Sequence, residues 1–192
     1  KEYRIVSSSG NYPDARPWIC DLDGENAQQL ADISIASFPR IARNTVVFMS
    51  DGYNGQGSGV YWMEAQPGSP VHKISNADTV HTQDARNWDA LDISPDGTRI
   101  VWAGPESEDS YTNQNVYIMN LDGSGKTRLL RDTGKHFFMI NWGEANRISL
   151  QVSNVGNAYS QRSWTIHPDG SGFTQAVADF SQWLHVGGPD AR

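Results

Sequence analysis

The sequence predicts an all-β protein with the architecture of a β-propeller, and three observations lead to this prediction. Apolar residues alternate or cluster in short β-branched and aromatic runs, and no stretch has the 3.6-residue spacing of an amphipathic helix. The chain contains 18 Gly and 9 Pro, which is typical of a protein with many tight turns. A strand–turn–strand unit also recurs four times along the 192 residues.

The recurring unit consists of an apolar strand, a turn built on Asp-Gly or Pro-Gly, and a second strand. Its copies read PWICDLDGENAQQL, VYWMEAQPGSPVHKI, VYIMNLDGSGKTRLL and SWTIHPDGSGFTQAV. Asp-Gly between apolar residues is a strong hairpin signal, because both turn positions tolerate positive φ. The turn glycines Gly24, Gly68, Gly123 and Gly170 are spaced by 44, 55 and 47 residues. This spacing is the period of a propeller blade of four strands.

A further strand precedes each hairpin, and these strands read RIVSSS, TVVFMS, RIVWAG and RISLQV. The first unit lacks an innermost strand, but the segment LHVGGPDAR at 184–192 resembles LDISPDG of the third unit. Reading on from Arg192 into KEYRIVSSS reproduces TRIVWAG. A ring needs such a closure, since an open end would expose unpaired strand edges.

We therefore predict a single domain, 1–192, that forms a ring of four blades of four antiparallel strands. The C-terminal strand is expected to complete the first blade. The expected blades comprise residues 1–32 plus 180–192, 33–76, 77–132 and 133–179.

The run SPDGTRIVW, followed by NVYIMNLDGSGKTRLL, resembles the PD40 (WD40-like) repeat of TolB-like β-propellers. The third blade matches this repeat closely, and the strand pattern extends over nearly the whole chain. The resemblance implies a periplasmic protein-binding scaffold, a gating cap on a serine peptidase, or a metal-dependent lyase of oligogalacturonate. Fold alone does not choose among these functions. Relatives typically have six or more blades, so four blades leave open pairing with a second copy or a place in something larger.

Composition excludes several classes of function. The net charge is −7 without a Lys/Arg cluster, whereas a nucleic-acid-binding protein needs a basic surface that neutralises phosphates. No apolar run approaches the roughly 20 residues that cross a bilayer. The single cysteine, Cys20, excludes an internal disulfide and is expected to be a small buried hydrophobic residue. Because the chain opens on Lys1, we expect a removed leader or a trimmed end. The resemblance to TolB-like propellers implies a periplasmic or extracellular location.

Two short motifs suggest a nucleotide-binding loop and a calcium-binding loop, but each is better explained as a turn. In GSGKT, the position where a phosphate loop needs its first glycine is Asn120, and the motif joins two strands rather than a strand and a helix. The run DLDGEN at 21–26 lacks the alternating acidic ligands and the distal Glu of a calcium loop. Both motifs are expected to be hairpin turns.

Tyrosines mark the long connections between the second and third strands of the blades. Each connection carries one, flanked by Gly, Asn, Ser or Asp, and Phe38, Trp88, Trp142 and Trp183 lie near the starts of the innermost strands. Since rotation relates the blades, these side chains are expected to form a ring on one face. They either wedge between blades or serve as platforms for a sugar ring or a partner's apolar side chain. The ligand-binding candidates are therefore Tyr12, Tyr53, Tyr111, Tyr159, Trp88, Trp142 and Trp183. The other tryptophans, Trp18, Trp62, Trp102 and Trp164, are expected in the core.

Three histidines form the candidate metal site. His81 and His136 precede the innermost strands of the third and fourth blades, and His185 lies within the closing strand. All three would lie at one mouth of the central channel, where metal-dependent relatives carry a histidine cluster. A hydrogen-bonded structural role for each histidine is the alternative. No Gly-x-Ser-x-Gly nucleophile elbow is present.

These observations favour a non-catalytic secreted or periplasmic module that binds a carbohydrate or a protein segment on the long-loop face. The first alternative is a metal-dependent polysaccharide lyase or hydrolase with its site at the channel mouth. The second is a structural interaction module of a larger assembly. The binding module needs no cofactor, whereas the lyase needs a divalent metal. The chain is expected to be a monomer or a self-associating dimer.

Overall fold

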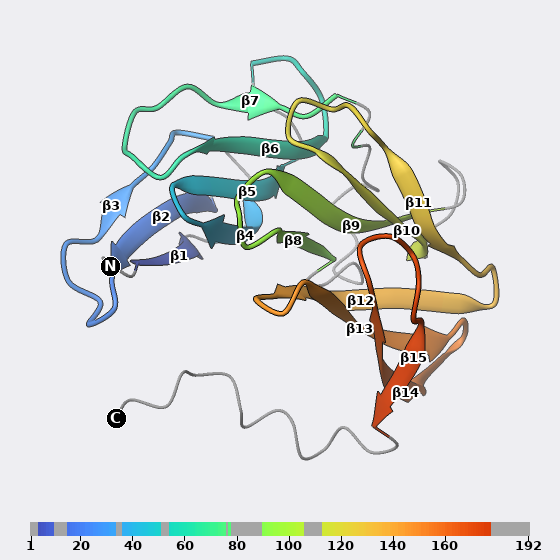
Figure 1. Cartoon of the computed structure of the whole chain (residues 1–192). Coiled ribbons are helices and arrows are strands. Elements are labelled where there is room, and N and C mark those ends of the chain that lie inside the picture. Colours follow the sequence, from blue (N-terminus) through green and yellow to red (C-terminus); the bar gives the residue numbers. More distant parts are fainter. Residues whose placement is uncertain are drawn as a thin grey trace.

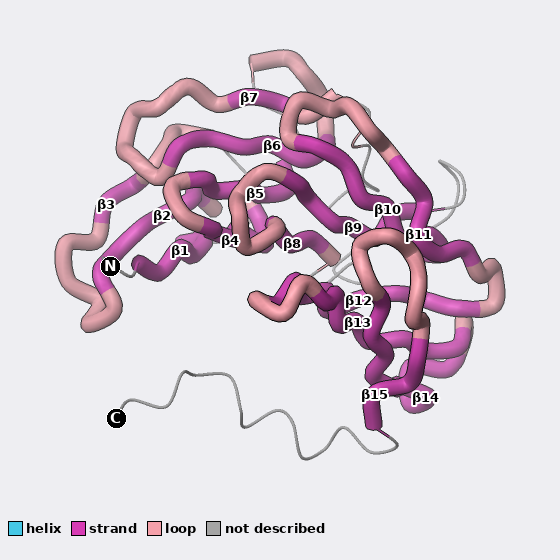
Figure 2. Tube along the Cα trace, viewed as in Figure 1, coloured by secondary structure: helices cyan, strands magenta, loops and turns pink. Residues whose placement is uncertain are grey.

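Strands make up all the regular structure that the computed structural model describes. It describes residues 4–9, 15–33, 36–50, 54–75, 77, 90–105 and 113–177, and these ranges hold fifteen strands. The strands form four antiparallel sheets, each composed of strands that follow one another in the chain (Figure 1). The sheets are arranged in sequence as an arc, with turns at their ends (Figure 2). The all-β prediction is confirmed.

The first sheet has three described strands and each of the others has four. The first comprises β1 (Arg4–Ser9), β2 (Arg16–Asp21) and β3 (Gln28–Gln29). The second comprises β4 (Ser37–Ala42), β5 (Thr45–Ser50), β6 (Gly59–Glu64) and β7 (His72–Lys73). The third comprises β8 (Leu91–Ile93), β9 (Arg99–Pro105), β10 (Asn113–Asn120) and β11 (Thr127–Arg131). The fourth comprises β12 (Lys135–Gly143), β13 (Arg147–Asn154), β14 (Asn157–Ile166) and β15 (Thr174–Val177).

Among the described residues, the first sheet has no strand that corresponds to β4, β8 or β12. Its strand β1 pairs only with β2, in the way that β5, β9 and β13 pair with the third strands of their sheets. The segment predicted to supply the missing strand, 184–192, lies outside the described residues. The described sheets do not form a closed ring, so ring closure and the number of blades stay predictions.

A cross-strand pair recurs at the same register in all four sheets. The pairs join the second and third strands and are Ser7–Trp18, Phe48–Tyr61, Trp102–Tyr117 and Leu150–Trp164. Two of them are stacked aromatic pairs, with ring centroids 6.1 Å apart for Phe48–Tyr61 and 5.2 Å apart for Trp102–Tyr117. This common register makes it possible to compare the four sheets position by position.

The sheets pack face to face because their central strands are apolar on both sides. In β5, Val46 and Phe48 pack with Ile19 and Leu30 toward the first sheet. Val47 and Met49 of the same strand belong to the larger core shared with the third and fourth sheets. A strand buried on both faces reads as a continuous apolar run, which explains TVVFMS and RIVWAG. Burial of each such side chain stabilises the fold by about 1.5–3 kcal/mol.

The first strands of three sheets, β4, β8 and β12, lie next to one another. In β4 and β12 a bulge interrupts the pairing, with Phe38 (φ 51°) and Met139 (φ 47°) in the left-handed region. Such bulges bend a strand and redirect the side chains that follow. After the bulges, Arg40 pairs with Val47 and Asn141 pairs with Ser149, which matches the pairing of Asp92 with Val101 in β8.

None of the described residues belongs to a helix that is long and apolar enough to cross a membrane.

Candidate functional site

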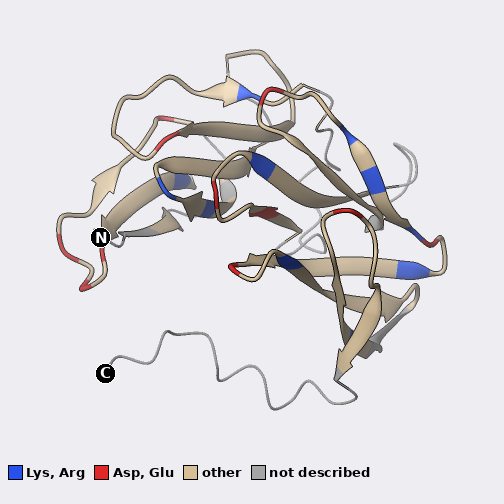
Figure 3. Ribbon diagram, in the orientation of Figure 1, with Lys and Arg blue, Asp and Glu red and all other residues tan. Residues whose placement is uncertain are grey.

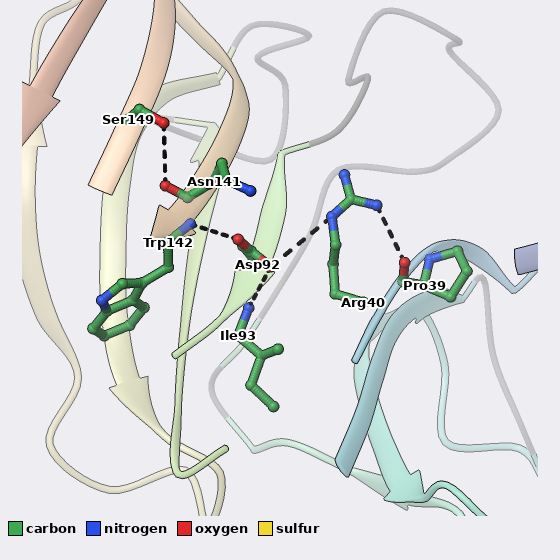
Figure 4. A network of polar contacts seen from close by, with 7 residues as sticks. All are labelled: Pro39, Arg40, Asp92, Ile93, Asn141, Trp142 and Ser149. Atoms are coloured by element: carbon green, nitrogen blue, oxygen red, sulfur yellow. Dashed lines mark hydrogen bonds and ion pairs between the residues drawn. The ribbon is translucent and has the colours of Figure 1, made fainter. Parts of the chain in front are cut away.

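Polar side chains occupy matching positions on the three adjacent inner strands. Arg40 lies on β4, Asp92 on β8 and Asn141 on β12, each at the same register within its sheet. Figure 4 shows these residues with the groups that they contact. Around them the strands are apolar, so this row of polar groups is the most distinctive feature of the inner strands.

Asp92 is the centre of the network. The residue is only 6% exposed, its Oδ2 accepts the backbone N–H of Trp142 at 2.5 Å, and its Oδ1 accepts the N–H of Ile93 at 2.9 Å. The guanidinium Nε of Arg40 lies 4.0 Å from Oδ1, and Nη1 of Arg40 donates to the carbonyl of Pro39 (Figure 4). One carboxylate therefore contacts the second, third and fourth sheets.

Burial raises the pKa of the Asp92 carboxyl above its usual value. The hydrogen bonds from the backbone of Trp142 and Ile93 and the positive charge of Arg40 act in the opposite direction and favour the carboxylate. A buried acid with a raised pKa is a candidate for acid–base chemistry. Here, however, both oxygens already bind backbone donors, so the arrangement favours a link between sheets over catalysis.

Neither Asp92 nor Arg40 was predicted from the sequence. The available signal was an acid between Leu91 and Ile93, within an apolar strand. Charges are rarely buried without a partner, so such a position predicts a buried ion pair. The identity of the partner could not be read from the sequence, because Arg40 is 52 residues away on another sheet.

Trp142 is the one predicted ligand-binding residue whose side chain the structure describes. It is 4% exposed, the guanidinium of Arg99 lies 4.9 Å from its ring centroid, and its Nε1 donates to Asn146 Oδ1 at 3.2 Å. A ring covered in this way would have to be uncovered before a ligand could stack on it. Its binding role stays a prediction.

The other aromatic candidates are not placed by the structure. Tyr12, Tyr53, Tyr111, Trp88 and Trp183 lie outside the described residues. Tyr159 belongs to β14, because β13 and β14 are joined by a turn at Val155 and Gly156 rather than by a long loop. The expectation of a long fourth loop was therefore wrong, and the Asn-Ala-Tyr-Ser run extends the strand instead.

Of the predicted metal ligands, only His136 lies in the described part of the chain. It is within β12 rather than before it, packs against Phe138 with ring centroids 5.4 Å apart, and has a buried Nε2 without a hydrogen-bond partner. Burial lowers the pKa of its imidazole. The described residues contain no group of three or more His, Cys, Asp or Glu side chains that could hold a metal ion. His81 and His185 lie outside these ranges, so their convergence with His136 stays a prediction.

The GSGKT motif lies in the turn between β10 and β11. Asp122 Oδ1 accepts the N–H and hydroxyl of Ser124, which lowers the pKa of Asp122 and fixes the turn. The ammonium of Lys126 lies 4.8 Å from the Tyr117 ring centroid and 5.4 Å from that of Trp102. These contacts account for the motif by turn chemistry and cation–π contact. The DLDGEN run likewise forms the β2–β3 turn, where Asn26 Nδ2 donates to Asp21 Oδ2.

Part of one long connection, 54–58, is exposed but firmly anchored. The hydroxyl of buried Tyr61 donates to the carbonyl of Gly57 at 2.5 Å, and Lys73 Nζ donates to the carbonyl of Gln56 at 2.7 Å. Gly55 and Gly57 have φ of 76° and 74°, which only glycine adopts without strain. The connection therefore presents Asn54 and Gln56 to solvent on a fixed backbone.

A groove of about 530 Å³ lies between the outer turns of the first two sheets. One side is lined by β2, β3 and the turn between them, and the other by Gln66 and Pro67 of the second sheet. The residues of the first sheet are Ile19, Cys20, Asp21, Asn26 and Gln28. Most acidic residues of the described chain lie in or next to turns (Figure 3). The groove lacks the apolar lining of a typical small-molecule site.

No protein-family model and no curated protein matches the chain. The four sheets, each antiparallel and packed face to face with the next, define a β-propeller fold. Solved structures with this fold are similar to the chain over most of its length.

Two TolB structures identify the kind of propeller. A protein described as TolB from Agrobacterium tumefaciens has a TM-score of 0.67 at 14% identity, over 90% of this chain and 60% of that one. TolB from Acinetobacter baumannii has a TM-score of 0.62 at 15% identity, over 90% of this chain and 41% of that one. The tricorn protease has a TM-score of 0.57 at 14% identity, over 93% of this chain and 18% of that one. The fold is a TolB-like β-propeller, and the chain spans 60% or less of the length of these TolB structures.

Proposed function

We propose that the chain is a non-catalytic binding module that holds a protein segment or a carbohydrate on the face formed by the connections between second and third strands. The observation that carries this proposal is the anchored connection at 54–58. Its backbone is fixed by Tyr61 and Lys73 while Asn54 and Gln56 remain exposed. A preformed loop loses little conformational entropy when it binds a ligand, which favours affinity.

The topology supports a shared binding face. Because every sheet has the same strand order and the same register between its second and third strands, the matching connections begin at the same end of each sheet. Tyr12, Tyr53 and Tyr111 belong to these connections in the sequence, and Tyr159 follows the fourth. Rigid amphipathic side chains of this kind are common in binding surfaces. We further propose a periplasmic or extracellular location, on the resemblance to the TolB-like family.

The proposal is tested by binding measurements on the purified chain. A glycan array and a library of immobilised peptides are probed in parallel, and hits are measured by calorimetry. Tyr61→Phe removes only the hydroxyl that holds Gly57, so we expect weaker binding with little loss of stability. Trp62→Phe, on the neighbouring position of β6, is the matched control. Absence of any hit, or equal affinity for Tyr61→Phe and the parent, would contradict a binding site at this connection.

A further inference from the structure

The groove between the outer turns of the first two sheets lies away from the proposed binding face. Connection 54–58 precedes β6, whereas Gln66 and Pro67 of the groove follow β6, so the two features are at opposite ends of this strand. The groove volume of about 530 Å³ is within the range of about 300–1,000 Å³ that is usual for small-molecule sites. The groove is therefore large enough to hold a ligand of its own.

The groove exists where the first sheet carries a less bulky cross-strand pair than the second sheet does. Ile19 and Gln28 form this pair, on the face that the first sheet turns toward the second. At the same register the second sheet carries Trp62 and His72, whose rings stack with centroids 4.7 Å apart. Ile19 is buried against the second sheet and Gln28 is exposed. Without two stacked rings at this register, the space beside β3 stays open.

One polar group of the groove replaces a glycine of the related turns. In the turns after β2, β10 and β14, a backbone hydrogen bond joins residues four apart, and the residue that follows its acceptor has positive φ. This residue is Gly125 (φ 67°) or Gly172 (φ 66°) in the third and fourth sheets, but Asn26 (φ 52°) in the first. Glycine adopts this left-handed region with the least strain. The first sheet thus keeps a carboxamide there, and its Nδ2 donates to Asp21 Oδ2 at 2.7 Å, which orients both groups.

The polar groups of the groove suit hydroxyls better than ions. Within the described ranges, the carboxamides of Gln28 and Gln66 make no hydrogen bond, and both residues are exposed on opposite walls. A carboxamide both donates and accepts hydrogen bonds, as a hydroxyl does. The described lining contains no Lys or Arg that would neutralise an anion. The groups available to a ligand are one carboxylate and three carboxamides, those of Asp21, Asn26, Gln28 and Gln66.

We propose that this groove binds a neutral sugar. Asp21 accepts hydrogen bonds from sugar hydroxyls, and Gln28 and Gln66 bind hydroxyls from the two walls. Ile19 and Pro67 provide apolar surface for the C–H groups of the ring. This site is additional to the face at the other end of β6, and the inference does not depend on the function proposed for that face.

NMR titration of the full ¹⁵N-labelled chain tests the proposal. The sugar probes are glucose, galactose, mannose and N-acetylglucosamine, each added separately. n-Butylamine and inorganic phosphate serve as a cationic and an anionic probe. We expect at least one sugar to give saturable shifts of the side-chain NH₂ signals of Asn26, Gln28 and Gln66, and the two charged probes to give none.

Two neighbouring glutamines provide a matched pair of variants. Gln28 and Gln29 are both exposed and are consecutive in β3, so their side chains point to opposite faces of the sheet. Gln28→Ala should weaken binding of the sugar about fivefold, the factor expected for one lost hydrogen bond. Gln29→Ala should leave the affinity unchanged. Asn26→Gly restores the glycine of the related turns, so it should weaken binding by a similar factor without lowering thermal stability.

The contrary outcomes are equally specific. Binding of n-butylamine or phosphate in preference to every sugar would assign a charged ligand to the groove and overturn the proposal. Equal losses of affinity in Gln28→Ala and Gln29→Ala would overturn it, because the two faces of β3 would then not differ. Unchanged affinity in both Gln28→Ala and Asn26→Gly would place the sugar elsewhere on the chain. The absence of a saturable shift with any sugar would also overturn the proposal.

Discussion

The carboxylate of Asp92 accepts the backbone N–H of Trp142 at 2.5 Å, and this contact joins the first strands of the third and fourth sheets. Strands β8 and β12 are adjacent but belong to different sheets, so the N–H of Trp142 has no strand partner on that side. A short side chain from the preceding sheet supplies the acceptor. Arg40, from the sheet before, adds a positive charge 4.0 Å from the same carboxylate.

We expect Asp92→Ala to lower the free energy of unfolding by about 3 kcal/mol, because it leaves a buried N–H and the Arg40 charge without their acceptor. Asp92→Asn keeps one acceptor oxygen and should cost less, about 1 kcal/mol. Glu144→Gln, in the exposed β12–β13 turn, is the control and should stay within about 0.5 kcal/mol of the parent. Urea unfolding measures all three. An Asp92→Ala variant as stable as the control would show that the contact does not hold the sheets together.

The raised pKa of Asp92 predicts an unusual pH dependence. When the folded pKa of an acid lies above its unfolded value, the folded state binds the proton more tightly. The resulting stabilisation is complete below the unfolded pKa and is lost as pH rises through the folded pKa. Relative to Asp92→Asn, the parent should therefore gain stability as pH falls from 7 toward 4. Asp96 acts in the opposite direction, since hydrogen bonds from Ser94 and Thr98 lower its pKa.

The pH prediction is checked by urea unfolding of the parent and Asp92→Asn at several pH values. Asp96→Asn is the control, and its difference from the parent should change with the opposite sign. A constant difference between the parent and Asp92→Asn over this range would contradict a raised pKa for Asp92.

The stability costs of alanine at Gly24 and at Gly123 distinguish the cost of backbone strain from the cost of losing a contact between sheets. Gly24 and Gly123 have φ of +84° and +85°, but an added Cβ meets nothing within 4 Å at Gly24. At Gly123 it would overlap Ser75 Oγ and lie 3.0 Å from the Ser75 carbonyl oxygen. Gly24→Ala should cost about 1–2 kcal/mol from the left-handed backbone alone. Gly123→Ala should cost about 1–3 kcal/mol more, because the outer turn of the third sheet must move away from Ser75. Equal losses of thermal stability would contradict this contact.

Sequence patterns predicted the strands well because each carries its own signal. TVVFMS and RIVWAG are buried on both faces, and the Asp-Gly turns fix their own geometry with local hydrogen bonds, as Asp122 does with Ser124. The Arg40–Asp92 pair could not be predicted, since it depends on how separate sheets pack. The fourth long loop was wrongly predicted because Asn157 and Ser160 are typical loop residues, whereas pairing with β13 extends β14 over them.

The amount of metal bound to the purified protein distinguishes the binding-module interpretation from the metal-dependent lyase alternative. The binding-module interpretation predicts that extensively dialysed protein retains no stoichiometric divalent metal. Should His81, His136 and His185 converge, the protein would instead retain one ion per chain, and His136→Ala would release it. His72→Ala is the control, because the His72 ring stacks on Trp62 with centroids 4.7 Å apart. Elemental analysis of the three proteins decides between the two interpretations, and a stoichiometric ion lost only in His136→Ala would reject the non-catalytic module.

The tyrosines of the proposed binding face distinguish a ligand platform from blade packing. Tyr61 is fully buried, so Tyr61→Ala provides the reference for a packed ring and should cost about 3–5 kcal/mol. A platform tyrosine stands in solvent, so Tyr12→Ala, Tyr53→Ala, Tyr111→Ala and Tyr159→Ala should each stay within about 0.5 kcal/mol of the parent. Each should also weaken the ligand found by array or library screening by more than about 1 kcal/mol if it is an anchor. Thermal melts and calorimetry on the same variants measure both effects. Four variants as unstable as Tyr61→Ala, with no ligand for the parent, would assign these rings to the core and remove the binding face.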